Sequence, residues 1–132
     1  MKNRESYMRI AYIVSEMSYC KRAQVGALIE KDGNVISIGY NGTPSGWENK
    51  CEGEDGKTKE EVLHAESNAI AKMARSSHSC DGATMYVTHS PCLECAKMIV
   101  QSGINKVYYN KIYRCTKGIS ILLSHGIECE QI

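Results

Sequence analysis

The apolar and polar positions of this chain follow patterns that predict helices and strands in turn. Residues 4–19 carry apolar side chains at helical spacing with charged residues between them, which predicts one amphipathic helix. Residues 24–30 and 34–40 are short runs rich in β-branched residues on either side of a Lys-Asp-Gly-Asn turn sequence. The two runs are therefore predicted to form a β-hairpin.

Helices and strands are predicted to keep alternating through the second half of the chain. The expected helices are 60–76, 92–102 and 117–124, and the expected strands are 84–88, 106–109 and 127–130. Such alternation indicates an α/β layer architecture, in which the initial hairpin makes the sheet mixed rather than purely parallel. The segment 41–59 is rich in glycine and charged residues and is longer than an ordinary connection, which is typical of a functional loop.

Length and charge narrow the class of protein. At 132 residues with no internal repeat or linker, the chain is expected to form one domain spanning 1–132. Its 16 lysines and arginines balance 15 acidic residues, and a net charge of +1 disfavours a polynucleotide partner. Because it has no signal-like start and no long apolar run, we expect a soluble, cytosolic protein whose thiols stay reduced and which binds no membrane.

Seven cysteines and four histidines are many for this length, and an odd number of cysteines cannot pair fully into disulfides. Cys92 and Cys95 lie three residues apart at the start of an expected helix, where their side chains project to nearly the same side. Pro91 suits the first turn of that helix, and a helix N-terminus favours the thiolate form that a metal needs. With His64 they make a Cys₂His set with one open position, which is the catalytic pattern for zinc.

Glu66 is the candidate proton carrier of this site. It lies two residues from His64, about 200° around an ideal helix, so the two side chains are not expected to point at one ion. A carboxylate beside a zinc-activated water passes its proton to substrate, and H-x-E…P-C-x-x-C is the signature of zinc nucleobase deaminases. The alternative is a structural Cys₂His₂ or Cys₄ site, or a redox pair without metal, but neither explains the His-x-Glu segment.

Nearly from end to end, the chain resembles the deoxycytidylate (dCMP) deaminases of the cytidine-deaminase superfamily. The matching segments are Cys20-x-Arg22-x-x-Val25-Gly26-Ala27, Gly39-Tyr40-Asn41-Gly42-Thr43-Pro44-x-Gly46, His64-Ala65-Glu66-x-Asn68-Ala69-Ile70, Thr84-x-Tyr86-x-Thr88, Pro91-Cys92-x-x-Cys95-Ala96-Lys97-x-Ile99 and Gly103-Ile104 before Val107-Tyr108-Tyr109. The zinc motif identifies only the superfamily, whereas the Gly-Tyr-Asn-Gly segment and the spacing to Tyr113 point to the deoxycytidylate branch. This resemblance implies a three-layer α/β/α fold with a mixed five-stranded sheet.

The resemblance also implies a reaction and its residues. The family converts dCMP hydrolytically to dUMP and ammonia, which supplies dUMP for thymidylate synthesis. By similarity, His64, Cys92 and Cys95 hold the zinc, and Glu66 moves protons from water to the pyrimidine N3 and then to the departing amine. No covalent enzyme intermediate is needed.

Three further residues are expected at the substrate by the same resemblance. Asn41 is expected to contact the deoxyribose and base, Tyr113 to line the nucleotide pocket, and Arg75 to lie near the active site and a subunit contact. Their ordinary alternatives are a turn asparagine, a core or surface tyrosine, and an exposed arginine at a helix end.

General chemistry suggests which residues could bind the phosphate of a nucleotide and whether His89 belongs to the site. A 5′-phosphate needs cations or backbone N–H groups, for which Arg114 and Lys117 are the candidates. His89 is more typical of a satisfied loop histidine than of a site residue.

Regulation and assembly are implied only by resemblance. Deoxycytidylate deaminases are typically hexamers activated by dCTP and inhibited by dTTP with Mg²⁺. The corresponding effector residues here are Arg22, Gln24, Gly39, Tyr40, Asn41 and Gly42.

Some relatives hold a second zinc through cysteines that match Cys20 and Cys51. The segment 51–63 contains no histidine, so Glu60 or another carboxylate would have to complete that site.

Two other functions compete with this interpretation. The same zinc site serves superfamily members that act on free cytidine or on a tRNA adenosine, although the near-neutral charge disfavours tRNA. A non-catalytic zinc module that only binds nucleotide is disfavoured by Glu66, because a structural site needs no general base.

Overall fold

The structure, a computed structural model, describes residues 2–132. It contains, in order, α1 (Lys2–Ser15), β1 (Gly26–Lys31), β2 (Asn34–Tyr40), α2 (Ala65–Met73), β3 (Thr84–His89), α3 (Leu93–Ser102), β4 (Lys106–Lys111), α4 (Lys117–Ser124) and β5 (Glu128–Gln131). This is the order of helices and strands that the sequence pattern predicts. In the described part of the chain, no helix is both long and apolar enough to cross a membrane.

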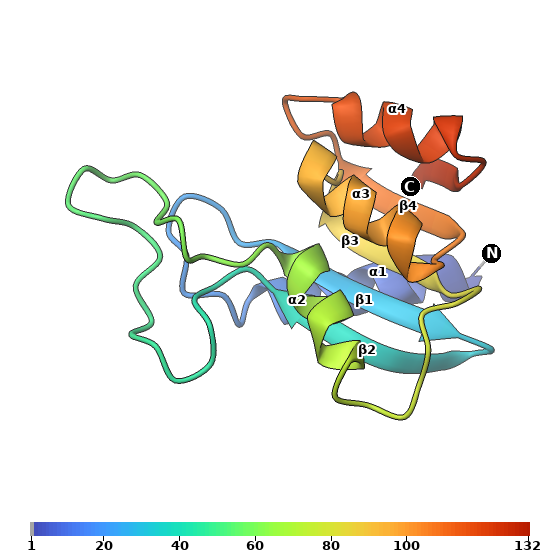
Figure 1. Ribbon diagram of the computed structural model, residues 1–132, viewed down its shortest axis with the longest axis horizontal. Coiled ribbons are helices and arrows are strands. Elements are labelled where there is room, and N and C mark those ends of the chain that lie inside the picture. The colour runs from blue at the N-terminus through green and yellow to red at the C-terminus, as the bar shows by residue number, and fades with distance from the viewer. Residues whose placement is uncertain (1) are drawn as a thin grey trace.

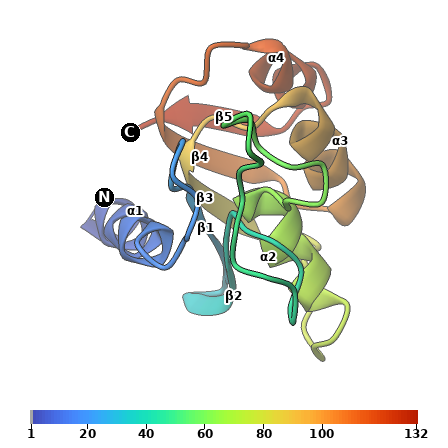
Figure 2. The same cartoon turned by 90° about the vertical axis from the view of Figure 1, so that its left-hand side faces the viewer.

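The five strands form one mixed sheet in the order β2-β1-β3-β4-β5. β1 is antiparallel to β2 and to β3, whereas β3, β4 and β5 run parallel. α1 covers one face of the sheet, and α2, α3 and α4 cover the other (Figures 1 and 2). The expected three-layer α/β/α architecture with a mixed five-stranded sheet is confirmed.

The strand β1 shows how the sequence produces these layers. Ala27 and Ile29 are fully buried in the core beneath α2, α3 and α4, whereas Leu28 is fully buried in the smaller core beneath α1. Side chains of a strand point alternately to its two faces, so a continuous apolar run is what a strand covered on both faces requires. The hairpin turns at Asp32 and Gly33 as predicted.

The two helix boundaries that differ most from the prediction are the end of α1 and the start of α2, and in both cases the backbone has other partners. α1 ends at Ser15 rather than at residue 19, because the chain continues as tight turns and then turns back towards the end of β2. α2 begins at Ala65 rather than at residue 60, because the backbone of Leu63 pairs with that of Gly42 in both directions, at 2.7 and 3.1 Å. Tertiary hydrogen bonds therefore override the helix propensity of residues 60–63.

Candidate active site

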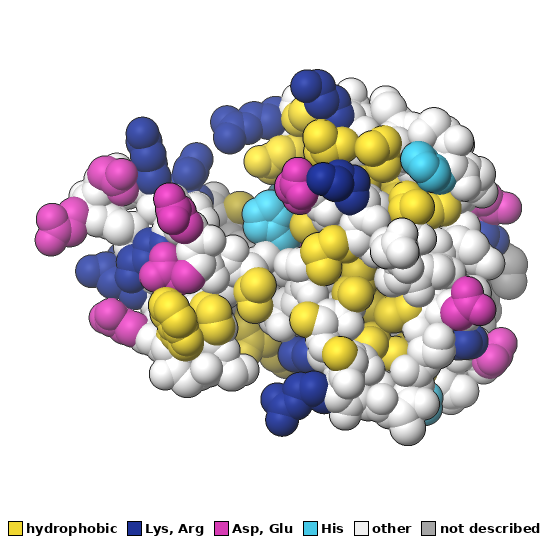
Figure 3. Space-filling model, viewed as in Figure 1, with side chains coloured by type: hydrophobic (Ala, Val, Ile, Leu, Met, Phe, Trp, Pro, Cys, Tyr) yellow, Lys and Arg dark blue, Asp and Glu magenta, His cyan; other side chains and the backbone are white. Residues whose placement is uncertain are grey.

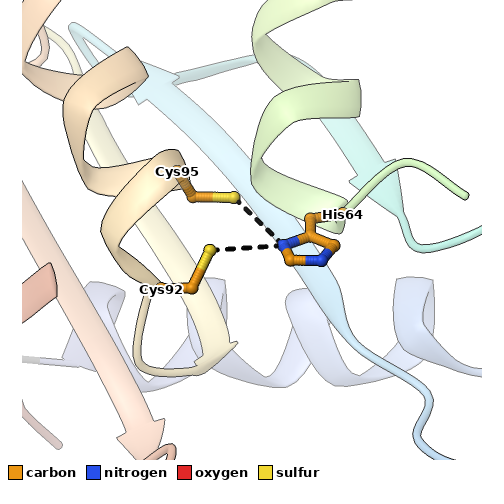
Figure 4. A group of neighbouring side chains, drawn as sticks. All are labelled: His64, Cys92 and Cys95. Atoms are coloured by element: carbon orange, nitrogen blue, oxygen red, sulfur yellow. Dashed lines mark hydrogen bonds between the residues drawn. The ribbon is translucent and has the colours of Figure 1, made fainter. Parts of the chain in front are cut away.

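The three predicted metal ligands converge from the starts of two helices. His64 directly precedes α2, Cys92 directly precedes α3, and Cys95 lies in the first turn of α3. The His64 Nδ1 atom lies 3.4 Å from Cys92 Sγ and 3.3 Å from Cys95 Sγ. Figure 4 shows both sulfurs facing this nitrogen. The structure thus brings together residues that the sequence separates by 28 and 31 positions.

This donor set fits a zinc ion. Two sulfurs and one imidazole nitrogen, all within 4.8 Å of one another, are the donors that zinc prefers. Zinc–sulfur and zinc–nitrogen bonds at a tetrahedral angle place sulfur and nitrogen about 3.5 Å apart, close to the distances found here. Three protein donors leave the fourth tetrahedral position for a small molecule.

The electrostatics of the two thiols also suit a metal. The pKa of Cys92 is lowered to about 3, because its sulfur accepts hydrogen bonds from Cys95 and then from His64. The same hydrogen bond, together with burial, raises the pKa of Cys95. One thiolate is therefore present at neutral pH, and binding of a metal would release the proton of the second.

Glu66 lies in the first turn of α2 with only 4% of its surface exposed. Burial raises the pKa of its carboxyl group to about 7, which suits a group that takes up and releases protons near neutral pH. His64 has extended backbone angles (φ −75°, ψ 157°), so the helical angle expected between His64 and Glu66 does not apply. Both residues nevertheless line the same cavity.

The cavity beside these residues has a volume of about 370 Å³. The segment after α1 contributes Arg22 and Val25 to its wall, the loop between β2 and α2 contributes Thr58, and the chain after β4 contributes Tyr113 and Arg114. This volume lies in the usual range for small-molecule sites. Tyr113 and Arg114 are residues that the sequence offers for the substrate, whereas Val25 and Thr58 carry no local signal, because the parts of this wall are distant in sequence.

Two arginines, Arg22 and Arg114, line this cavity. Arg22 was expected at an effector site and instead lies here. Arg114 was one of two candidates for a phosphate contact, and it lines the cavity whereas Lys117 does not. The structure therefore separates these two candidates.

Asn41 lies just after β2 and holds the segment that follows α1. Its side-chain Oδ1 accepts the Val25 N–H at 2.9 Å, and its Nδ2 donates to the Ala23 carbonyl at 2.8 Å. Its backbone is not left-handed, since Asp32 alone has a positive φ among the non-glycine residues 2–132, so the turn explanation fails. Asn41 lines the active-site cavity, as the expected substrate contact requires.

Tyr113 also lines the cavity, and the buried hydroxyl of Ser90 fixes its backbone. The Tyr113 N–H donates to Ser90 Oγ at 2.6 Å, and the Arg114 guanidinium lies 5.9 Å from the centre of its ring. Arg75 is placed differently. It follows the far end of α2, exposed and outside the residues that line the cavity, so this chain alone does not bring it to the substrate.

The expected effector residues do not form one site. Besides Arg22, Gln24 donates from Nε2 to the Ser18 carbonyl, and Gly39 packs so tightly that a Cβ would lie 2.5 Å from the Ala65 carbonyl oxygen. Tyr40, Asn41 and Gly42 line a second cavity of about 260 Å³. The two cavities share Asn41.

The structure joins Cys20 and Cys51 in a disulfide bond. This bond differs from the reduced thiols expected of a cytosolic protein, and it joins the two residues that match ligands of a second metal in some relatives. In the bonded form neither sulfur is a thiolate, so a second metal there remains a hypothesis that requires the bond to be reduced. The neighbouring carboxylate is that of Glu52, not of Glu60.

A Cys₂His cluster beside a buried glutamate is the arrangement of zinc-dependent nucleobase deaminases. Residues 1–111 match the family described as the cytidine and deoxycytidylate deaminase zinc-binding region, and the chain belongs to this family.

Individual relatives extend the match over most of the chain. The deoxycytidylate deaminase of Enterobacteria phage T4 is 39% identical over 92% of this chain and 85% of its own length. The deoxycytidylate deaminase of Homo sapiens is 36% identical over 80% of this chain and 62% of its own length.

One similar protein has been solved with nucleotides. The crystal structure of the dCMP deaminase from cyanophage S-TIM5, in complex with dCMP and dUMP, is 51% identical with a TM-score of 0.97. The match covers 99% of this chain and 97% of that one.

Proposed function

We propose that this protein converts dCMP and water to dUMP and ammonia. The observation that carries the proposal is that the cluster of His64, Cys92 and Cys95 borders one cavity, lined by His64, Cys92 and buried Glu66, together with two arginines. The similarity to a cyanophage enzyme solved with dCMP and dUMP supports the same substrate.

The residues divide the chemistry between them. A zinc ion bound by His64, Cys92 and Cys95 would lower the pKa of a water molecule in the cavity and make it nucleophilic. The Glu66 carboxylate accepts a proton from water and delivers it to N3 of the pyrimidine, which makes C4 electrophilic. After the water oxygen has bonded to C4, Glu66 takes the remaining proton of that hydroxyl and delivers it to the amine, which leaves as ammonia when the C4–N bond breaks. Burial of Glu66, which raises its pKa to about 7, allows it to accept and donate in turn.

The nucleotide is recognised by the rest of the cavity wall. The two guanidinium groups of Arg22 and Arg114 are the cations that a 5′-phosphate requires, and arginine suits phosphate because it donates in a planar fork. Asn41 and Tyr113 line the same cavity and are the groups available to the sugar and base. Arg114→Ala should therefore weaken dCMP binding.

Regulation and assembly complete the proposal. We infer a single domain over 1–132 that acts as a homo-oligomer, a hexamer as in similar enzymes, in the cytoplasm. The second cavity, with Tyr40, Asn41 and Gly42, is the proposed site for the activator dCTP and for the inhibitor dTTP with Mg²⁺. Dependence of the rate on each effector, and sedimentation of the protein, test this part.

The decisive assay supplies the zinc-loaded protein with dCMP, deoxycytidine, cytidine and a tRNA in parallel. We expect dUMP and ammonia from dCMP in preference to the others, and preferential deamination of cytidine or of a tRNA adenosine would refute the proposal. Arg114→Ala should raise KM for dCMP by about tenfold or more, as loss of a charge-assisted contact does, and spare deoxycytidine. Lys117→Ala, outside the cavity wall, is the matched control.

A further inference from the structure

We propose that the Cys20–Cys51 disulfide is a redox-sensitive link that holds the loop wall of the substrate cavity in place. Its reduction loosens this wall and weakens substrate binding, while the metal ligands stay assembled. The readout of this proposal rests on the proposed deaminase activity.

The loop between β2 and α2 has little else to anchor it. Figure 1 shows it extending away from the sheet, and in Figure 3 the side chains at that end are mostly charged, with both signs present. In the segment 41–64, which the structure describes throughout, Cys51 is the only buried residue, with 1% of its surface exposed. A loop without an apolar core depends on such single attachments to keep one conformation.

The disulfide ties this loop to a second piece of the cavity wall. Cys20 lies in the segment after α1, and the bond spans 31 residues of sequence. Next to the bond, the Glu52 carboxylate accepts the backbone N–H groups of Lys21 and Arg22 at 3.1 to 3.4 Å. The bond therefore positions Arg22, a proposed phosphate contact, together with the loop residue Thr58.

The metal ligands do not depend on this bond. His64 and Glu66 are held by α2, and Cys92 and Cys95 by α3, and both helices pack on the main core of the sheet. The base of the loop is held separately by the backbone pair between Gly42 and Leu63. Loss of the disulfide should therefore affect binding more than the chemical step.

The bond is buried, with 5% of Cys20 and 1% of Cys51 exposed. Cys20 lines the active-site cavity and Cys51 lines the second cavity, so a reductant approaches the bond through these cavities. The remaining five cysteines are unpaired. In a cytosolic protein, as proposed for this chain, a disulfide is usually transient and either catalytic or redox-sensing.

The chemical step is thiol–disulfide exchange. A small dithiol attacks the S–S bond, transfers two electrons and two protons, and leaves as its own disulfide, while Cys20 and Cys51 become thiols. An oxidised dithiol reverses the step. The freed sulfurs lie close to the Glu52 carboxylate, so the alternative is that the two reduced cysteines bind a second zinc ion.

The test compares oxidised protein with protein treated with a water-soluble phosphine, which reduces the disulfide with water as proton source and does not rely on thiols that compete for zinc. We expect two additional thiols per chain, a KM for dCMP raised by about threefold or more, and kcat changed by less than about twofold. A double variant, Cys20→Ser with Cys51→Ser, should show the higher KM before and after treatment. Cys129→Ser, an unpaired cysteine on β5, should respond like the parent chain.

Three results would overturn the proposal. The first is that no thiols are released in the folded protein, and the second is that thiols are released while KM stays constant. The third is that zinc per chain rises by one upon reduction with KM unchanged, which would show a metal site. Absence of dCMP turnover in both redox states would instead refute the proposed function.

Discussion

Gly118, in the first turn of α4, lies against the carbonyl oxygen of Pro91, at the start of α3. A Cβ atom at position 118 would lie 2.1 Å from that oxygen and 2.8 Å from the carbonyl oxygen of Cys92. Both contacts are with backbone atoms, which cannot move away as a flexible side chain can. The close approach of α4 therefore helps to fix the backbone that carries a metal ligand.

Replacing this glycine should damage both stability and the metal site. Gly118→Ala forces α4 away from residues 91 and 92, and such overpacking costs about 1–3 kcal/mol of unfolding free energy. We also expect reduced zinc content, because Cys92 shifts. Urea unfolding and metal analysis check this, with Ser120→Ala on the exposed side of the same helix as control. Equal stability of Gly118→Ala and the parent chain would contradict the packing argument.

Glu66→Gln should retain zinc and lose turnover. The amide keeps the size of the carboxyl group but cannot accept the water proton, and loss of a general acid–base group typically costs about 10²–10⁴-fold in rate. Ammonia release and zinc content are the measurements. Glu94→Gln, an exposed carboxylate on α3 paired with Lys97, should leave both unchanged. Near-normal turnover in Glu66→Gln would contradict the role of Glu66 in proton transfer.

His64→Ala should remove the metal rather than only the activity. Only two sulfurs would remain as protein donors, too few for a stable site with one open position. Zinc per chain should fall well below one after dialysis, and the midpoint of thermal unfolding should lose its dependence on added zinc. His125→Ala, at the exposed end of α4, serves as the matched control. Full zinc retention in His64→Ala would mean that other donors hold the ion.

Asn41→Ala should lower both stability and substrate affinity. It leaves the Val25 N–H and the Ala23 carbonyl without their partner, at a cost of about 1–3 kcal/mol. Because the same segment carries Arg22, KM for dCMP should rise as well. Unfolding curves and steady-state kinetics measure the two effects, and Asn34→Ala at the hairpin turn is the control. An unchanged unfolding curve would show that water replaces both hydrogen bonds.

Titration of His89 should make the protein less stable as the pH drops through about 6.5, whereas Glu66, whose pKa is raised to about 7, acts in the opposite direction. Burial, and then the charge of Lys111, lowers the pKa of His89 in the folded chain. Between that lowered pKa and the unfolded value of about 6.5, residue 89 binds more protons in the unfolded chain, so its contribution to the free energy of unfolding decreases as pH falls. In His89→Asn this contribution should be missing from the change in unfolding free energy between pH 7 and pH 5.5, measured by urea titration, and an identical change in parent and variant would exclude it.

Local patterns predicted the elements well and their ends poorly. The hairpin followed from its turn residues at 32 and 33, and the layers followed from alternation of helices and strands. The start of α2 was wrong because Leu63 pairs with Gly42, a contact between residues far apart in sequence. Helix propensity depends on a residue and its near neighbours in sequence, so it does not account for hydrogen bonds to a distant segment.

Some residues of the candidate site could likewise be predicted from local sequence, and others could not. His64, Glu66, Cys92 and Cys95 could be named from spacing alone, because the members of each pair lie close together in the sequence and form a known motif. The positions of Arg22 and Arg75 could not be, since they depend on how the loop and the far end of α2 lie relative to the cavity. The pairing of Cys20 with Cys51 belongs to this second group, because a link across 31 residues leaves no local pattern.

The convergence of His64 with two cysteines from another helix has a consequence for how the protein matures. Only Cys92 and Cys95 are neighbours in sequence, so a chain still emerging from synthesis offers no complete binding site until α2 and α3 have packed on the same face of the sheet. Zinc should therefore bind only after the protein has folded. Each tenfold increase of free zinc above its dissociation constant should raise the free energy of unfolding by about 1.4 kcal/mol. The lifetime of the mature protein thus becomes tied to the metal supply of its surroundings.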